Sequence, residues 1–434
     1  MKGPSKALIL ITLLISIAIQ TFAQNSLKNN NKMTLAQARK MIVSKNVGSQ
    51  IMAVYTLVNL GDKQSADEIA KLLDSNSSKL QQISIWALGK LKCTKFIHKI
   101  KQMCSARDLG VQTMSMKVLC DLSGAKAIPV LLKKLAKNDQ IINNKIKTLL
   151  LQFSPQKILP LLKNYLKHPQ TIIRLNAVNL LGDIDGKQSL EYLNKMLDDK
   201  SILVVKAAGK LIAGKKREAQ KYIINTLKSD NLRAKLSILR GIEDSQNKKI
   251  IKYIIPLANS ISPQIRKQVA ILLGSWKVKN GIPVLEKMLK DPSELVRAAS
   301  LWSLSKFEKI PLMKLSEKML LDKSWKVRCT TINILGRPAA KQPCSLISKF
   351  LADPHWSVRY SAVKKLEKLN CSKNLPKLYR MLKDNYETTL VKSAICHALG
   401  RFHKKESIKY LIDALQSKSG KISGSAELAL TRIM

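Results

Sequence analysis

The segment Asp291-Pro292-Ser293-Glu294-Leu295-Val296-Arg297-Ala298-Ala299 is the most informative part of this sequence for its fold. An Asp-Pro-Ser turn leads directly into apolar residues with helical spacing, among them Val296, Ala299 and Leu304. Asp and Ser side chains accept the free N–H groups at the start of a helix. Apolar residues that recur at intervals of three and four indicate one buried face of a helix. The stretch therefore predicts a turn followed by an amphipathic helix.

Leu304 near the end of this helix has counterparts at regular steps along the chain, and we call these residues anchors. They lie at Leu57, Leu88, Leu119, Leu150, Leu181, Leu273, Leu304, Leu335, Leu366, Leu399 and Leu430. Between Leu181 and Leu273 the register loosens, with anchors expected near Leu211 and Arg240. Self-similarity at such a fixed period is typical of repeat arrays, in which each unit contacts only its neighbours.

Each unit is predicted to hold two helices. The first is introduced by a proline in many copies, namely Pro129, Pro160, Pro256, Pro283, Pro311 and Pro376. Proline suits the first helical turn because its missing N–H has no partner there. The second helix carries the anchor and is expected to end near a glycine that adopts the left-handed conformation. No segment alternates like a half-buried strand, so the fold class is all-α, a solenoid of about 12–13 two-helix units.

Two copies carry a resemblance to a known family. Asp291 to Ala299, and Asp353-Pro354-His355-Trp356-Ser357-Val358-Arg359, resemble HEAT repeats of the short PBS-lyase HEAT-like type. The resemblance covers nearly the whole chain after residue 33, and it implies an α-solenoid with a right-handed superhelix. It also implies a scaffold that binds proteins, although a shared fold does not fix a function. Bilin lyases and some DNA glycosylases use similar repeats, so a lyase-like or glycosylase-like enzyme stays as an alternative.

Basic residues recur seven positions before the anchors and are the candidate site residues. They are Arg174, Arg233, Arg266, Arg297, Arg328, Arg359 and Lys392. Acidic residues stand thirteen positions before three anchors, at Asp291, Asp322 and Asp353, while the early repeats carry Gln50, Gln81, Gln112 and Asn143 in the basic register. In HEAT repeats such Asp and Arg residues usually bridge neighbouring repeats. The alternative is a stripe of arginines that grips phosphate, sulfate or carboxylate groups, because the guanidinium fork matches these ions.

Two tryptophans occupy equivalent places at the start of second helices. Trp325 and Trp356 are separated by one repeat period. They either pack across the seam between repeats or flank a binding surface. Trp86, Trp276 and Trp302 lie deeper in apolar stretches and are predicted to be core residues.

The start of the chain predicts export. Lys2 and Lys6 precede an apolar run, and Thr21-Phe22-Ala23 offers small residues at a cleavage site. This layout is that of a secretory signal peptide. We expect a signal peptide at 1–23, a disordered linker at 24–33 and the solenoid at 34–434, with a bend or register change at about 200–245. Localisation is then periplasmic or extracellular, and an uncleaved membrane anchor is the alternative.

The chain is strongly basic, with a net charge of +47, or +45 without the two lysines of the signal. Such a charge attracts polyanions, although the lysines are spread along the whole chain and also suit a generally solvated surface. The seven cysteines include no Cys-x-x-Cys pair, and their odd number leaves at least one thiol. We expect most of them to be buried and unpaired.

No catalytic constellation is evident. The five histidines include no His-Glu pair, and no phosphate-binding glycine loop or nucleophile elbow occurs. We predict no catalytic residue, no cofactor and no metal. The predicted function is a non-enzymatic exported scaffold that binds another protein, with a binder of nucleic acid or anionic polysaccharide as the alternative. Self-association through the C-terminal repeat is a further expectation.

Overall fold

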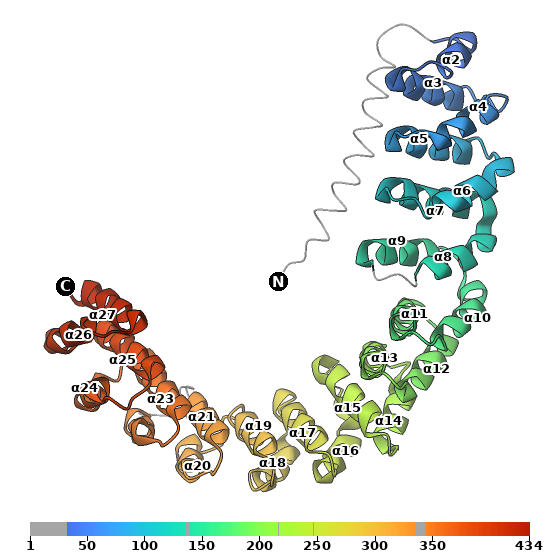
Figure 1. The fold of residues 1–434 in the computed structure, drawn as a ribbon. Helices are drawn as coiled ribbons and strands as arrows, with labels where there is room; N and C mark the ends of the chain where they lie inside the picture. Colours follow the sequence, from blue (N-terminus) through green and yellow to red (C-terminus); the bar gives the residue numbers. More distant parts are fainter. Residues whose placement is uncertain (1–32, 136–138, 216, 246, 336–342) are drawn as a thin grey trace. The chain divides into compact units, whose positions relative to one another are not determined.

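The structure is a computed structural model that describes residues 33–135, 139–215, 217–245, 247–335 and 343–434. The predicted signal peptide and all but the last residue of the predicted linker lie outside these residues. The described part is helical and contains no strand. Helices alternate along it as thirteen pairs of a first and a second helix (Figure 1).

The chain divides into two compact units, unit 1 at residues 1–207 and unit 2 at residues 208–434. The division falls inside helix α13 (Ile202–Gly214), within the range where the sequence predicts a bend or register change. The bend and the handedness of the superhelix stay predictions.

In unit 1, the first helix of each pair is followed by a second helix that packs on the second helix of a neighbouring pair, as α3 packs on α5 and α5 on α7. The α-helices before α13 are α2 (Leu35–Met41), α3 (Val47–Asn59), α4 (Ala66–Lys71), α5 (Ser78–Lys90), α6 (Ile97–Met103), α7 (Leu109–Ser123), α8 (Ile128–Lys134), α9 (Gln140–Leu150), α10 (Pro155–Leu166), α11 (Thr171–Asp183) and α12 (Lys187–Lys195).

Unit 2 repeats this arrangement, and its second helices α15 to α27 follow one another side by side in Figure 1. Its α-helices after α13 are α14 (Gln220–Lys228), α15 (Leu232–Gly241), α16 (Ile251–Ile254), α17 (Pro263–Ser275), α18 (Ile282–Met288), α19 (Glu294–Leu304), α20 (Leu312–Met319), α21 (Trp325–Ile334), α22 (Cys344–Lys349), α23 (Trp356–Lys368), α24 (Leu375–Lys383), α25 (Thr389–Phe402), α26 (Ile408–Leu415) and α27 (Gly420–Ile433).

Short 3₁₀ helices begin or end many first helices. They are η1 (Leu72–Asp74), η2 (Thr94–Phe96), η3 (Gly124–Ala127), η4 (Met196–Asp198), η5 (Glu243–Ser245), η6 (Lys248–Ile250), η7 (Ile255–Asn259), η8 (Lys279–Gly281), η9 (Phe350–Ala352), η10 (Ser372–Asn374) and η11 (Lys405–Ser407). The prolines Pro129, Pro283 and Pro376 stand in the first turn of first helices as predicted. The prediction is wrong for Pro160, which lies inside α10 because that helix already begins at Pro155.

Most anchors form the core between adjacent second helices. Ten anchors, from Leu57 to Leu399, are 0–2% exposed, whereas Leu430 in the last helix is half-buried. The two anchors expected in the irregular stretch are wrong. Gly209 packs against Ser237 in the same way as Gly274, which follows the anchor Leu273, packs against Ser303, which precedes the anchor Leu304. The residues that take the place of anchors are therefore Ala208 and Ile238. Both are buried, whereas Arg240 is exposed.

The glycine after the anchor serves close packing and not a left-handed turn. Gly274 lies inside α17, and a Cβ added to it would meet the Ser303 Cβ at 2.4 Å. Its absence lets neighbouring second helices approach. The left-handed residue comes three positions later and is rarely glycine: Lys92, Lys277, Asn370 and His403 all have φ near 50°.

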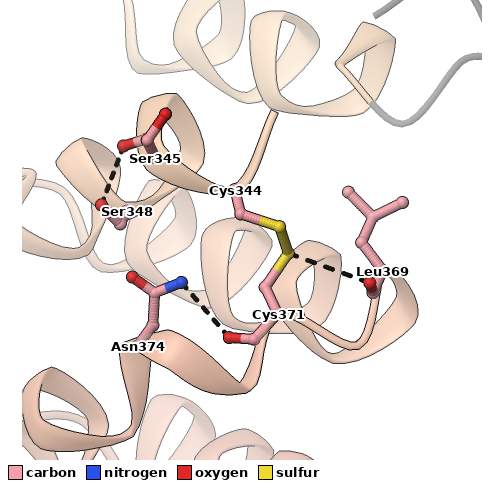
Figure 2. Close-up of a disulfide and its surroundings, with 6 residues drawn as sticks. All are labelled: Cys344, Ser345, Ser348, Leu369, Cys371 and Asn374. Carbon is pink, nitrogen blue, oxygen red and sulfur yellow. Dashed lines mark hydrogen bonds between the residues drawn. A yellow bond between two sulfur atoms is a disulfide. The ribbon is translucent and has the colours of Figure 1, made fainter. Parts of the chain in front are cut away.

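Cysteine pairing differs in part from the expectation. Cys344 at the start of α22 forms a disulfide with Cys371 after α23, which ties the two ends of one helix pair together (Figure 2). Cys104, Cys120 and Cys396 are buried and unpaired, as expected. Burial raises the pKa of Cys104 to about 12, so this thiol stays protonated and unreactive.

No helix in the described ranges combines the length and apolar character that a membrane crossing requires.

Candidate functional site

The arginines before the anchors reach from one repeat to the next. Arg174, Arg266, Arg297 and Arg328 each bind the aspartate that lies 25 residues later, at Asp199, Asp291, Asp322 and Asp353. Arg359 binds Glu387, which lies 28 residues later. In each pair Nε and Nη2 donate to the two carboxylate oxygens at 2.6–2.9 Å. This parallel geometry is the strong bidentate form of the ion pair.

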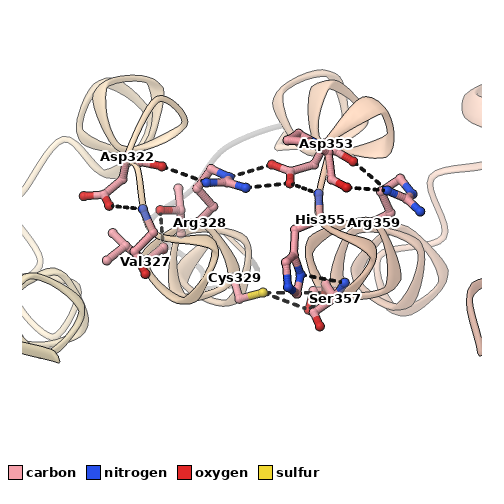
Figure 3. A network of polar contacts seen from close by, with 12 residues as sticks. Asp322, Val327, Arg328, Cys329, Asp353, His355, Ser357 and Arg359 are labelled. Carbon is pink, nitrogen blue, oxygen red and sulfur yellow. Dashed lines mark hydrogen bonds and ion pairs between the residues drawn. The ribbon is translucent and has the colours of Figure 1, made fainter. Parts of the chain in front are cut away.

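Each of these arginines also holds the turn of its own repeat. Nη1 donates to the carbonyl oxygen six residues earlier at 2.8–2.9 Å. In unit 2 these contacts join into a continuous ladder, because each linking aspartate binds two arginines (Figure 3). Its carboxylate binds the arginine of the preceding repeat, and its backbone carbonyl binds the arginine of its own repeat. The arginines bound by the carbonyl are Arg297, Arg328 and Arg359. Arg297 donates four hydrogen bonds in this way, two of them from Nη1.

The ladder is shielded from solvent. The side chains of Arg174 and Asp199 are 4% and 6% exposed, and those of Arg297 and Asp322 are 6% and 7% exposed. Burial alone would raise the pKa of Asp322, but hydrogen bonds from Arg297 and the Ser324 amide hold it below its usual value. The guanidinium groups are thus neutralised within the chain, which favours the bridging role over a grip on an external anion.

The other two candidate residues differ from the ladder arginines. Arg233 lies five residues before Ile238 and therefore outside the register; Asn231 stands seven residues before Ile238 and caps α15. Lys392 is half-buried in α25, and no carboxylate within the described ranges pairs with it.

In the early repeats, two glutamines in the arginine register bind the turn of their own repeat, and within the described residues neither binds the next repeat. Gln81 donates to the Ser75 carbonyl oxygen at 2.8 Å, six residues earlier, as the arginines do. Gln50 makes a similar bond to the Ile42 carbonyl at 3.2 Å. An amide cannot form the charged bidentate link to the next repeat, so this part of unit 1 has no equivalent ladder step at these positions.

Sequence reasoning did not identify two carboxylates that bind ladder arginines, or the histidine ring that caps a helix. Asp199 could have been found, because it follows Arg174 at the same spacing at which the other aspartates follow their arginines, whereas Glu387 is offset by three positions. His355 caps α23 by accepting from the Ser357 amide, and its ring stacks on Trp325 with centroids 4.4 Å apart and planes 5° apart. A histidine between two tryptophans in space gives no signal in the sequence.

The aromatic residues of three adjacent second helices, α19, α21 and α23, are partly open to solvent. Trp325 and Trp356 are 36% and 40% exposed, and Tyr360, one turn after Trp356, is 37% exposed. Trp302 was predicted to be core, but it is 40% exposed because it stands two residues before its anchor, on the side away from the core. We call Trp302, Trp325, Trp356 and Tyr360 the aromatic strip.

A cavity of about 600 Å³ continues from the aromatic strip across α21, α23 and α25. It is lined by Asn333, Tyr360, Ser361, Lys364, Lys365, Glu367, Lys368 and Arg401. Glu367 is buried beneath it and pairs with Lys364 at 2.5 Å. The rim is therefore mainly basic, and it borders aromatic surface.

One serine–histidine contact resembles catalytic chemistry but lacks its geometry. Ser425 lies 3.3 Å from His397 Nε2, and its hydroxyl donates to the Lys421 carbonyl at 2.7 Å. Burial and nearby Lys364 lower the pKa of His397. Ser425 is only 6% exposed, so its oxygen is not presented to a substrate. No group of three or more His, Cys, Asp or Glu residues in the described ranges is placed to hold a metal ion.

The sequence matches the family described as HEAT repeats over residues 128–213, 251–313, 310–390 and 345–431. It matches none of the curated proteins with which it was compared. Among solved structures, Kap121p is 14% identical with a TM-score of 0.48, and the match covers 85% of this chain and 48% of that one. This chain therefore spans about half the length of Kap121p.

Two further solved structures resemble the chain. Kap95p, in its complex with RanGDP, is 14% identical with a TM-score of 0.38, and the match covers 94% of this chain and 67% of that one. Human deoxyhypusine hydroxylase in complex with glycerol is 15% identical with a TM-score of 0.26, covering 63% and 95%. At these identities the likeness concerns the fold alone.

Proposed function

This chain belongs to the family of HEAT-repeat proteins, and we propose that it is an exported, non-enzymatic scaffold that recognises another protein through its second helices. The observation that carries this proposal is the aromatic strip, in which four large aromatic side chains on three adjacent helices are 36–40% exposed. Aromatic residues are enriched where proteins bind one another, and Trp and Tyr are enriched among the few residues that carry most of the binding energy there.

The border of the strip indicates the character of the partner. Lys364, Lys365, Lys368 and Arg401 line the adjoining cavity, against a single acidic residue, Glu367. The ladder arginines contribute no net attraction, because carboxylates neutralise them. The partner surface is therefore expected to combine apolar side chains with acidic ones, since complementary charge speeds association and fixes register.

Export is supported by two features. The first residues have the layout of a secretory signal peptide, and the Cys344–Cys371 disulfide suits an oxidising compartment. Fusing alkaline phosphatase to the C-terminus, with and without residues 1–23, tests this part. Activity that depends on residues 1–23 supports export, and retention of the intact chain in the cytoplasm contradicts it.

Site-specific photo-crosslinking tests the binding surface. A photoreactive phenylalanine analogue at Tyr360 should give one discrete adduct in cells that produce the protein. The matched control places the analogue at Tyr386, which is 95% exposed and outside the strip. The adduct at Tyr360 should disappear when Trp325 and Trp356 are replaced by alanine. Equal adducts at both positions, or an adduct indifferent to the tryptophans, would refute the proposal.

The net charge of +47 favours a second candidate function, the binding of a polyanion. This candidate needs a surface other than the ladder.

A further inference from the structure

The first helices of unit 2 carry a recurring cluster in which two lysines flank a tyrosine ring. At Tyr253 the ammonium groups of Lys228 and Lys252 both lie 5.2 Å from the ring centroid. At Tyr410 those of Lys383 and Lys409 lie at 5.2 and 5.1 Å. In each cluster one lysine immediately precedes the tyrosine and the other comes from the preceding first helix, α14 or α24. We call these clusters the lysine–tyrosine clamps.

The two clamps occupy the same register of the repeat. Tyr253 and Tyr410 stand equally far before their anchors, Leu273 and Leu430. Of the four repeats between them, the last has a tyrosine at this position and the other three have aliphatic residues; in chain order these residues are Val284, Leu315, Leu346 and Tyr379. The clamps are therefore two occurrences of one arrangement at one position of the repeat.

A cavity opens at the second clamp. It measures about 440 Å³ between α24 and α26, and it is lined by Pro376, Tyr379, Arg380, Lys383, Glu406, Lys409 and Tyr410. A volume of this size holds a small ligand or one segment of a polymer. Three cations and one carboxylate line it, so the cavity favours an anionic group.

The tyrosines of this cavity form a fixed wall. The rings of Tyr379 and Tyr410 are stacked with centroids 3.8 Å apart and planes 6° apart. The Tyr379 hydroxyl lies 2.9 Å from Ser407 Oγ, which is fully buried. Each ring covers one face of the other, and the ring edges carry the positive end of the aromatic quadrupole. The edges add to the attraction for an anion.

Most of the cations here are not neutralised. Lys383 lies 3.7 Å from Asp413, but across the described ranges no carboxylate forms an ion pair with Lys228, Lys252, Arg380 or Lys409. The ladder shows the opposite arrangement, in which every arginine that joins it is paired. The positive charge of the clamps is therefore available to a ligand.

We propose that the first-helix face of unit 2 binds an anionic polysaccharide, whose carboxylate or sulfate groups lie on the lysine–tyrosine clamps and in the cavity between α24 and α26. This gives the polyanion candidate a surface and a ligand class, and it does not depend on the aromatic strip. Single-stranded nucleic acid fits less well, because base stacking needs open ring faces, and Tyr379 covers one face of Tyr410.

Two quadruple variants of the full chain test the proposal. The clamp variant is Lys228→Ala, Lys252→Ala, Lys383→Ala and Lys409→Ala. The matched control removes the same charge from second helices outside both cavities, with Lys235→Ala, Lys267→Ala, Lys392→Ala and Lys421→Ala. Binding is measured to polygalacturonate, to single-stranded DNA and to phosphatidylglycerol vesicles, at about 50 and 200 mM salt.

The clamp variant is expected to lose at least about fivefold in affinity for polygalacturonate, as the removal of four exposed charge contacts implies. For the control variant, the change in the logarithm of the affinity for polygalacturonate should be less than half of that for the clamp variant. Both variants should keep the melting temperature of the parent. An equal loss in both variants would overturn the proposed surface. Tighter binding of the parent to DNA or vesicles than to polygalacturonate would overturn the ligand class. Crosslinking at Tyr360 tests the protein-binding proposal separately.

Discussion

At the scale of single residues, the ladder depends on what a guanidinium can do and an ammonium cannot. Arg328 donates two parallel bonds to Asp353 and a third to the Asp322 carbonyl oxygen. One planar group thereby joins two turns, and the fork is rigid enough to lose little entropy in doing so. Lys392 stands in the same register without such a link.

Replacing Arg328 by alanine should lower the stability of unit 2 by about 3–5 kcal/mol, because Asp353 would be left buried without its partner. The Asp353 side chain is only 6% exposed. Thermal melting followed by circular dichroism measures the change.

Lys392→Ala is the matched control for this prediction, and its melting temperature should stay near that of the parent. An Arg328→Ala variant that melts like the parent would show that the ladder adds no stability at this step.

At the scale of helices, close approach between second helices is set by the residue after the anchor. A Cβ at Gly274 would lie 2.4 Å from Ser303 Cβ and 2.7 Å from its Cα. The second of these atoms belongs to the backbone and cannot turn aside. The contact between α17 and α19 therefore depends on the missing side chain at this position.

Gly274→Ala should cost about 1–3 kcal/mol through overpacking, even though alanine is the better helix former. Gly424→Ala in α27 is the control, because nothing lies within 4 Å of the added Cβ. That variant should be neutral or more stable by up to about 1 kcal/mol. Urea unfolding of both variants gives the comparison, and equal shifts would contradict the packing role.

The disulfide acts on one helix pair. Cys344 and Cys371 close a loop with a sequence separation of 27 residues, for which restriction of the unfolded chain predicts about 3–4 kcal/mol of stabilisation. Cys371→Ser should lower the melting temperature, and a reducing agent should lower that of the parent to a similar value. Cys93→Ser, at a half-buried unpaired thiol, is the control and should respond to the reducing agent as the parent does.

At the scale of the whole molecule, polar links between repeats are unevenly distributed. Arginine–carboxylate pairs link the repeats from α17 to α25, whereas the repeats from α5 to α9 carry Gln81, Gln112 and Asn143 in the same register. Each repeat contacts mainly its neighbours, so its stability depends on local contacts. Breaking the links should therefore destabilise the repeats that they join.

Acid should therefore affect the two stretches differently. Burial would raise the pKa values of Asp291 and Asp322, but their arginine partners hold them below the usual value. A lowered pKa in the folded state gives stability that is present above the unfolded value of about 3.9 and is lost as pH falls through the folded value. Hydrogen exchange after incubation between about pH 4 and 2 should show loss of protection first in α17 to α23.

The repeats from α5 to α9 serve as the internal control, since they lack the arginine links at this register. Loss of protection at the same pH in both stretches would contradict the role of the ladder in acid stability.

The helical solenoid, its regular period and most anchors could be predicted from the sequence, because every unit buries its apolar face in the same way and the pattern therefore recurs. The sequence also placed five arginines in one register. It failed between Leu181 and Leu273, where Ala208 and Ile238 replace the expected anchors, since a change in spacing hides which apolar residue is buried.

How neighbouring repeats use these residues could be read only from the folded arrangement. Whether a guanidinium is neutralised depends on a carboxylate 25 or 28 residues away, and whether a tryptophan is open depends on which side of its helix faces the core. The same holds for the lysine–tyrosine clamps, whose second lysine comes from the preceding helix. Contacts of this kind arise between repeats, so the pattern within one repeat cannot specify them.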